Sequence, residues 1–390
     1  MIAPSTPPAT AENQARNPAV GSCVLLPGTL APTAWLRSPE LQERLRSLRW
    51  LTQASTAAVV EPLPGAETAT QPLPRRLPHE QWLHRAFNTS ASQSNTWSAL
   101  PVMLGIGIDQ LHLNEIDVAL TSEQADQLER AVKPLLEADQ VALERVRCGP
   151  SEVWRLRFPQ ALAVECSSPL AALGQATHRH APVGADSARW RKFVHELEMA
   201  WHCSGPDQRF AAAGTLPVNS LWLAEPLALP GPYARHFEQI VLVDSGCTLT
   251  ETWLTHCAQA MDVEIVDLSD PGAADRLALS VSRLWLDASA LRARLADDPH
   301  AWVIALEALD RTLERYTAAT NPVHALEWVL SGKTALRCRR ARSGADIRDA
   351  QGASLWQSIR AALRGQPKPV RSTRPGKPFD SVELLSEPES

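Results

Sequence analysis

Two apolar runs joined by a helix-length segment limit what this chain can fold into more than any other feature. Residues 240–244 read Ile-Val-Leu-Val-Asp, and residues 263–268 form a second, largely apolar run. Continuous runs of this kind are typical of strands that are buried on both faces of a parallel sheet. Because residues 250–260 between them favour a helix, we predict a right-handed strand–helix–strand unit.

Other segments extend this pattern into an α/β protein with a mostly parallel sheet. Residues 186–203 carry the strongest helical pattern, because their apolar side chains recur on one face. Thr121 and Gln124 form a capping box at the start of another helix. We predict further strands at 23–28, 99–120, 154–158, 284–287 and 334–340, and further helices at 38–48, 302–313 and 355–363.

Composition allows a large core and excludes one class of partner for the chain as a whole. The 390 residues are 44% hydrophobic and 21% charged, which is ordinary for a globular protein. The net charge of −5 gives no overall nucleic-acid signature. Basic residues nevertheless dominate residues 331–377. This segment is either a solvated edge strand with a basic tail or a site for an anionic partner such as nucleic acid.

Cysteine spacing and hydropathy indicate a cytoplasmic location. The 7 cysteines are scattered and include no Cys-x-x-Cys pair, so we expect reduced thiols. Residues 1–18 lack the basic start and apolar stretch of a signal peptide. No apolar run is long enough to cross a bilayer, so no membrane partner is expected.

Two segments carry candidate chemistry. Asp244 and Ser245 follow a predicted buried strand, and open α/β sheets bind ligands at the carboxyl ends of their strands. The alternative for these residues is a helix cap and turn. On the helix at 186–203, the face opposite the apolar stripe presents Arg191, His195, Glu198 and His202. That face is either a metal or acid–base set or simply solvated.

Common phosphate-binding and hydrolase motifs are not found. Residues 331–334 read Ser-Gly-Lys-Thr, but a P-loop requires glycine at the position of Glu327 and a helix after the motif. His178 and His180 lie near Cys166 in sequence, which suits either a metal site or a surface loop.

The sequences RWRKFVHELEM at 189–199 and PVNSLWL at 217–223 resemble the core signature of the RpfE-type bacterial regulatory proteins. LLPG at 25–28 and LPHEQWL at 77–83 are also similar. The same central segment is similar to the cofactor-independent, archaeal-type phosphoglycerate mutases of the alkaline phosphatase superfamily. This resemblance implies a doubly wound α/β core, degraded from an alkaline-phosphatase-like fold, with a smaller inserted α+β domain.

The ligands that the mutase reaction needs are missing from this sequence. That chemistry requires paired metal ions held by Asp and His residues. The chain contains no Asp-His dipeptide, and its first strand ends in Leu26-Pro27-Gly28 without an acid. It also departs from the RpfE-type family, because Met103 stands where a Pro-Val-His-Leu stretch usual in that family has His. We therefore expect no catalytic residue, no metal and no cofactor, and predict a non-catalytic regulatory or binding protein.

The predicted ligand-binding residues are Asn219, Asp244, Ser245, Glu196 and His202, and the predicted partner is an unknown protein or a small anionic ligand. Asn219 is either a polar ligand contact or a turn residue. Two alternatives stay open: a metal-dependent phosphoglycerate mutase-like enzyme with scattered ligands, and a nucleic-acid-associated factor that uses residues 331–377.

The predicted organisation divides the chain by composition and pattern. Disordered ends at 1–20 and 365–390 flank a core that begins at 21–60 and continues at 181–364, interrupted by a Pro-rich linker at 61–78 and an inserted domain at 79–180.

Overall fold

The structure is a computed structural model in which part of the chain can be described. The described residues are 22–32, 34–49, 59–62, 75–89, 95–107, 110–204, 218–224, 230–231, 234–277, 282–320, 327–331 and 335–339. The helix expected at 355–363, the tails at 1–20 and 365–390 and most of the basic segment at 331–377 lie outside them.

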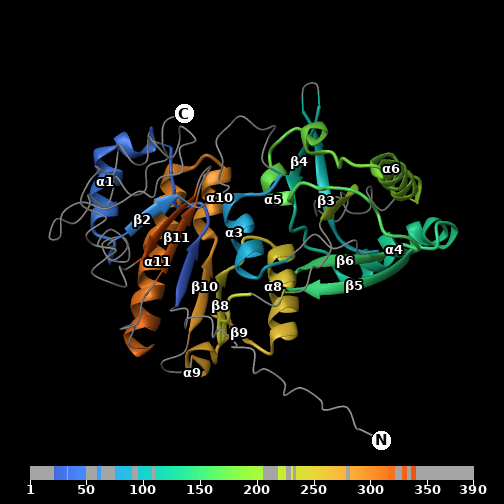
Figure 1. Ribbon diagram of the computed structural model, residues 1–390. Helices are drawn as coiled ribbons and strands as arrows, with labels where there is room; N and C mark the ends of the chain where they lie inside the picture. The colour runs from blue at the N-terminus through green and yellow to red at the C-terminus, as the bar shows by residue number, and fades with distance from the viewer. Residues whose placement is uncertain are drawn as a thin grey trace, which may run out of the picture.

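The larger of two sheets has the strand order β2-β12-β11-β1-β10-β8-β9 (Figure 1). Its parallel strands are β1 (Cys23–Leu26), β8 (Gln239–Asp244), β9 (Glu264–Asp267), β10 (Arg283–Asp287) and β11 (Glu327–Ser331). Two antiparallel strands, β12 (Ala335–Arg339) and β2 (Val59–Pro62), close one edge. The predicted mostly parallel sheet, including the parallel pair β8–β9, is confirmed.

Helices cover both faces of this sheet, because alternate side chains of each strand point to opposite sides. Cys23 and Leu25 pack against α3 (Pro78–Ala86) and α8 (Thr248–Met261). Val24 and Leu26 pack on the other face, against α1 (Pro39–Arg46), α10 (Ser289–Leu295) and α11 (Pro299–Thr320). The sheet is therefore doubly wound, which is consistent with the core implied by the sequence resemblance. We call this part the core lobe.

The connections leave β8 and β10 on opposite faces. Helix α8 leads from β8 outward to β9, whereas α10 and α11 lead from β10 past β1 to β11. The boundary between these adjacent strands is a topological switch point, where open α/β sheets place their ligand crevices.

The smaller sheet is antiparallel and forms an accessory lobe beside the carboxyl end of the large sheet (Figure 1). Its strands are β3 (Thr96–Ile106), β4 (Leu111–Glu115), β5 (Ala142–Cys148), β6 (Ser151–Arg157) and β7 (Ser220–Ala224). Helices α4 (Ser122–Ala138) and α6 (Ser187–Ser204) pack on it through one apolar cluster. Short elements complete the fold: η1 (Trp35–Arg37), α5 (Pro169–Ala172), η2 (Thr177–His180) and α9 (Ala273–Arg276).

Local sequence signals explain the accessory helices. In α4 the Thr121 side chain accepts from the Gln124 amide, and the Gln124 side chain accepts from the Thr121 amide, as the capping box predicts. In α6 the predicted stripe is buried through Trp190, Phe193 and Leu197.

The packing divides the chain differently from the predicted domain bounds. Helix α3, expected in the inserted domain at 79–180, packs on the large sheet. Helix α6 and strand β7, expected in the core at 181–364, pack with the antiparallel sheet. The inserted lobe therefore extends from β3 to β7, because the apolar stripe of α6 covers the antiparallel sheet and not the parallel one.

No helix in the described part of the chain is long and apolar enough to cross a membrane.

Candidate functional site

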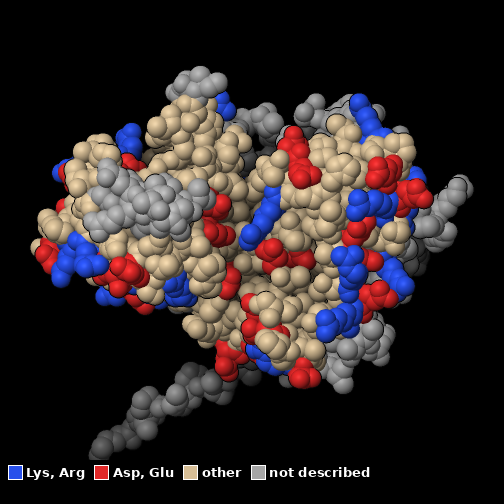
Figure 2. Space-filling model, turned by 180° about the vertical axis from the view of Figure 1, so that it is seen from behind, with Lys and Arg blue, Asp and Glu red and all other residues tan. Residues whose placement is uncertain are grey.

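Two acidic residues end the strands on either side of the switch point. Asp244 is the last residue of β8 and Asp287 the last residue of β10, and the two are register partners across the strand pair. This is the place where a doubly wound sheet offers a ligand crevice, so we take it as the candidate site. Figure 2 shows acidic side chains gathered around the hollow between the two lobes.

Asp244 is held by the turn that follows its strand. Its Oδ1 accepts a hydrogen bond from the Gly246 amide at 2.7 Å, and the Arg292 guanidinium lies 3.8 Å away. Gly246 has a φ of +79°, and a Cβ there would lie 2.9 Å from the Cβ of Ala288. The turn therefore needs glycine at this position. The cap-and-turn alternative for Asp244 describes this geometry, since its carboxylate accepts from the amide two residues further on.

Asp287 is more deeply buried than Asp244, with 4% of its surface exposed. It accepts two hydrogen bonds from Ser289, from the amide at 2.8 Å and from the hydroxyl at 2.5 Å. Burial raises the pKa of Asp287, and the charge of Asp244 adds to the effect. Its carboxylate is thus turned toward the start of α10 and paired within its own turn.

Helix α8 adds a third carboxylate, Glu251, to the same edge. The Ser245 hydroxyl donates to Glu251 at 3.3 Å. Burial raises the pKa of Glu251, and the charges of Asp267, Asp117 and Asp244 raise it further. The edge therefore carries an excess of negative charge that the nearby protein leaves largely uncompensated.

The carboxyl end of β1, by contrast, is sealed. A Cβ on Gly28 would lie 2.3 Å from the Leu291 Cα, and Gly28 has a φ of +76°. The indole N–H of Trp302 donates to the Gly28 carbonyl at 2.8 Å, and the Thr29 hydroxyl donates to the Leu26 carbonyl at 2.8 Å. Helix α10 thus packs directly on the end of this strand, and the contacts found there among the described residues come from no acidic side chain.

An apolar cluster fills the contact between the lobes above this edge. Its buried members are Leu100, Val102, Leu113, Ile116, Val153, Leu170 and Ala172 of the accessory lobe, with Cys247, Ala288 and Leu291 of the core lobe. A cluster of this composition excludes water from the region between the lobes.

The side chains at this edge do not fit paired metal ions. Among the residues that the structure describes, no three His, Cys, Asp or Glu side chains are grouped to hold a metal. Asp244, Asp287 and Asp117 each accept a hydrogen bond from a backbone amide instead. Because a hard dication needs several free oxygen ligands, the site as built is a poor match for one.

The predicted site residues fall in two places. Asp244 and Ser245 lie at the switch point. Asn219 lies in the accessory lobe, where its side chain accepts from the Leu104 amide at 2.8 Å and donates to the Leu104 carbonyl at 2.8 Å. This amide extends the pairing of β7 with β3, because both of its hydrogen bonds go to the backbone of Leu104 on the neighbouring strand.

Helix α6 carries the remaining predicted residues. Glu196 lies near Lys192 at 3.6 Å, and His202 is exposed. On the same helix Glu198, expected on the solvated face, accepts from the Ser220 hydroxyl at 2.5 Å, and burial raises its pKa. These contacts fix α6 to β7 in the accessory lobe and do not build a site with Asp244.

The structure shows three carboxylates at the edge that the sequence analysis did not select: Asp287, Glu251 and Asp117. Asp287 carries the same signal as Asp244, an acid at the end of a predicted buried strand, and could have been found by that rule. Asp117 could not, because it reaches the edge from the accessory lobe.

The His178–His180 pair does not form a metal site within the described residues. His180 is buried, and burial lowers its pKa, helped by the charges of Arg75 and Arg179. Burial raises the pKa of the Cys166 thiol to about 12, which disfavours the thiolate that binds metals.

Comparisons with known proteins give fold-level similarity only. No family model and no curated protein matches this sequence. Among solved structures, the cofactor-independent phosphoglycerate mutase from Thermoplasma acidophilum is 9% identical, with a TM-score of 0.35, over 83% of this chain and 90% of that one. The PH0037 protein from Pyrococcus horikoshii is 9% identical, with a TM-score of 0.46, over 84% of this chain and 89% of that one. Function is therefore inferred from the site itself.

Proposed function

We propose that this chain is a non-catalytic regulatory or binding protein on an enzyme-derived α/β fold. The observation that carries the proposal is the state of the carboxyl edge. Asp244, Asp287 and Asp117 each accept from a backbone amide, Glu251 accepts from the Ser245 hydroxyl, and an apolar cluster fills the space between the lobes above them.

Two-metal phosphoryl transfer would need other side chains at the carboxyl edge of the large sheet. Such chemistry stabilises the attacking and leaving oxygens with paired ions in a hydrated, shaped cavity. Here the end of β1 is closed by Leu291 and Trp302, and Gly28 occupies the turn. An ion at this position would lack ligands from the central strand of the sheet.

The negative charge of the carboxyl edge also bears on which of the predicted partners binds there. The charges of Asp267 and Asp244 both act on Glu251 at this edge, and a small anion approaching these carboxylates would be repelled. Of the two predicted partner classes, this favours a protein over a small anionic ligand. The nucleic-acid alternative stays a prediction, because residues 340–377 lie outside the described part of the chain.

The direct test is an assay of the full chain for interconversion of 2- and 3-phosphoglycerate in the presence of Mn²⁺. A cofactor-independent mutase assayed in parallel is the positive control. We expect no turnover above the protein-free blank. Turnover that disappears in Asp244→Asn would overturn the proposal, because it would place working chemistry at the switch point.

A thermal-shift screen of the same protein with metals, phosphosugars and nucleotides extends this test. A ligand that binds only the folded chain raises the melting temperature by mass action. We expect no shift with phosphosugars, and a clear shift with one of them would contradict the preference for a protein partner.

A further inference from the structure

The accessory lobe is joined to the core lobe by two chain connections that run side by side. One leaves α3 toward β3, and the other returns from β7 to β8. The Gly231 amide donates to the Phe87 carbonyl at 3.0 Å, and the Arg235 amide donates to the Ala86 carbonyl at 2.6 Å. We call these four paired residues the neck. Because the lobe from β3 to β7 is one insertion in the chain, only two stretches of backbone join it to the core lobe, and the covalent chain permits the lobe to swing about the neck.

Away from this neck, the accessory lobe contacts the first turns of α8. The Asp117 Oδ1, in the segment after β4, accepts from the Thr248 amide at 2.9 Å. One turn further along, the Thr252 hydroxyl and the Cys148 thiol of β5 are 2.8 Å apart. A carboxylate at a helix N-terminus is stabilised by the unpaired amides and the helix dipole. The carboxylate of Asp117 thus links the accessory lobe to the N-terminus of α8 in the core lobe.

A second contact joins the lobes at α3. The Ser168 hydroxyl donates to Glu80 at 2.5 Å, and the Ser168 amide donates to the Arg75 carbonyl at 2.7 Å. Burial raises the pKa of Glu80. This contact lies on the same helix as the neck, so it can act as part of the pivot.

Closing the lobe brings like charges together. Asp117 acts on Glu251, as do Asp244 and Asp267 of the core lobe. The basic groups in this neighbourhood are Arg155 of β6 and Arg292 of α10. Arg155 also lies 3.4 Å from Glu144, and Arg292 is 3.8 Å from Asp244, so neither is bonded to Asp117. When the lobes are in contact, Asp117 is therefore attracted by the Thr248 amide and repelled by the charge of Glu251.

We propose that Asp117 and the first turn of α8 form a latch that holds the accessory lobe closed over the carboxyl edge, and that Glu251 opposes its closure. The latch sets how often the apolar cluster between the lobes is exposed. It acts whatever partner the edge binds, and its test is independent of phosphoglycerate turnover.

The structure supplies a reporter for opening and a reporter for unfolding on the same helix. Cys247 lies in the apolar cluster between the lobes and is 2% exposed. Cys257 lies on α8 but packs against the large sheet and is fully buried. Opening of the latch exposes Cys247 and leaves Cys257 buried, whereas unfolding exposes both. Cys203 is exposed in the closed protein and serves as the internal reference.

The experiment is pulsed alkylation of the full chain with iodoacetamide at one pH, read for each cysteine by peptide mass spectrometry. In Asp117→Ala the Cys247 rate, relative to Cys203, should rise about tenfold, since a charged hydrogen bond is lost. In Glu251→Gln it should fall about twofold, because a like-charge contact is removed while the acceptor for Ser245 is kept. Asp139→Ala, which removes an exposed acid elsewhere in the accessory lobe, should change nothing.

An unchanged Cys247 rate in Asp117→Ala would overturn the latch. If Cys247 and Cys257 accelerate together in Asp117→Ala, the variant Asp117→Asn decides. It keeps an oxygen acceptor for Thr248, so the latch requires a smaller rise of Cys247 with slow Cys257. Joint acceleration of both thiols in this variant as well would show that Asp117 supports global stability and would refute the latch.

Discussion

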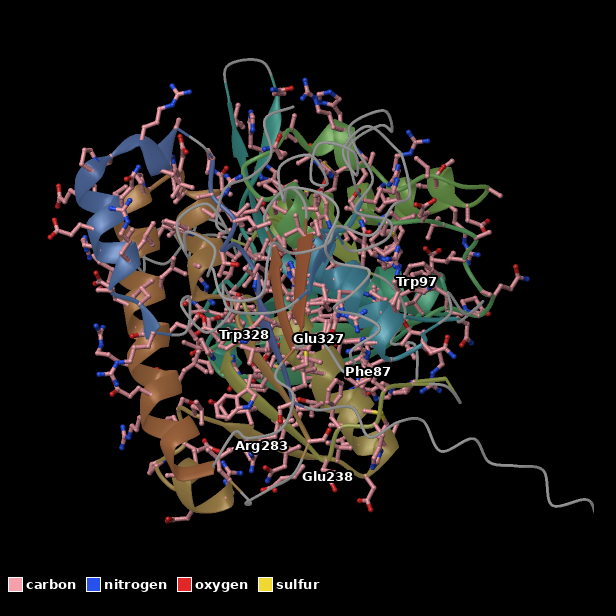
Figure 3. The ribbon with its side chains drawn as sticks, turned by 60° about the vertical axis from the view of Figure 1, so that its left-hand side comes forward. Phe87, Trp97, Glu238, Arg283, Glu327 and Trp328 are labelled. Carbon is pink, nitrogen blue, oxygen red and sulfur yellow. The ribbon has the colours of Figure 1, made fainter. Side chains whose placement is uncertain are left out.

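Carboxylates at the two ends of the large sheet differ in their partners and in the direction of their pKa shifts. At the amino end, Glu327 begins β11 beside Trp328 (Figure 3). It is bonded to Arg235 at 3.1 Å and to Arg337 at 2.8 Å. Burial alone would raise the pKa of Glu327, but the two arginines hold this pKa below its usual range. At the carboxyl end, Asp287 and Glu251 have raised pKa values and meet few basic groups.

This difference separates structure from potential function. At the amino end the charge of Glu327 is matched by two arginines, so it stabilises the fold. Charges at the carboxyl end are tolerated at a cost in free energy, and such sites are where proteins keep ligand or partner contacts. At the turn of Gly28, by contrast, the end of β1 packs against Leu291 and Trp302, so this part of the carboxyl end belongs to the core.

The largest effect is expected at that sealed turn. Gly28→Ala places a Cβ 2.3 Å from the Leu291 Cα at a φ of +76°. We expect a loss of roughly 4 kcal/mol in the free energy of unfolding, from backbone strain and overpacking together. Gly272→Ala is the matched control, because nothing lies within 4 Å of a Cβ there. Urea unfolding measures both, and equal stability of the two variants would show that the end of β1 is open.

The next effect tests the matched charges of the amino end. Glu327→Gln leaves Arg235 and Arg337 without their carboxylate in a site where the Glu327 side chain is 10% exposed. We expect a loss of about 3 kcal/mol in the free energy of unfolding. Glu314→Gln, which breaks a more exposed pair with Arg49, should have little effect. A small loss in Glu327→Gln would remove the contrast between the two ends.

A smaller effect is expected in the accessory lobe. Asn219→Ala removes the amide that donates to and accepts from Leu104. We expect a loss of about 1 kcal/mol in thermal or urea unfolding. If Asn219 instead contacts a ligand, the variant would keep its stability and lose binding in the thermal-shift screen. That result would restore Asn219 to the binding site.

The smallest effect concerns pH at the carboxyl end. The pKa of Asp287 is raised in the folded protein above the usual 3.8. The folded state therefore holds this proton more tightly, and stability falls as pH rises through the raised pKa. Asp287→Asn keeps an acceptor for Ser289 and removes the charge. Relative to the original chain, the variant should gain stability as pH rises above the usual pKa of 3.8, and the gain should level off above the raised pKa. Asp275→Asn, at an exposed acid on α9, should give a flat difference.

Much of this fold could be predicted from periodicity, because the patterns involved depend on residues that are close in sequence. The run at 240–244, the stripe of α6 and the Thr121–Gln124 box each depend on neighbours in sequence, and each appears in the structure. The domain bounds could not be read in this way. Which sheet a helix covers depends on long-range packing, and the stripe of α6 fits either sheet equally well.

The site was only partly predictable for the same reason. Asp244 and Ser245 follow a strand and were found by a rule about strand ends. Asn219, Glu196 and His202 were selected from a resemblance in sequence, and the structure puts them in the other lobe. Asp117 was missed because its contact with Thr248 joins residues that are distant in the chain.

One measurement tests most directly whether this edge has lost its capacity for paired divalent ions. Mn²⁺ is titrated into the metal-free full chain in a calorimeter, with Asp244→Ala titrated in parallel. We expect no saturable heat in either protein, since one oxygen of each aspartate at the switch point already accepts from an amide and no cluster of three ligating side chains is present among the described residues. Saturable uptake of Mn²⁺ by the original chain that vanishes in Asp244→Ala would contradict this account.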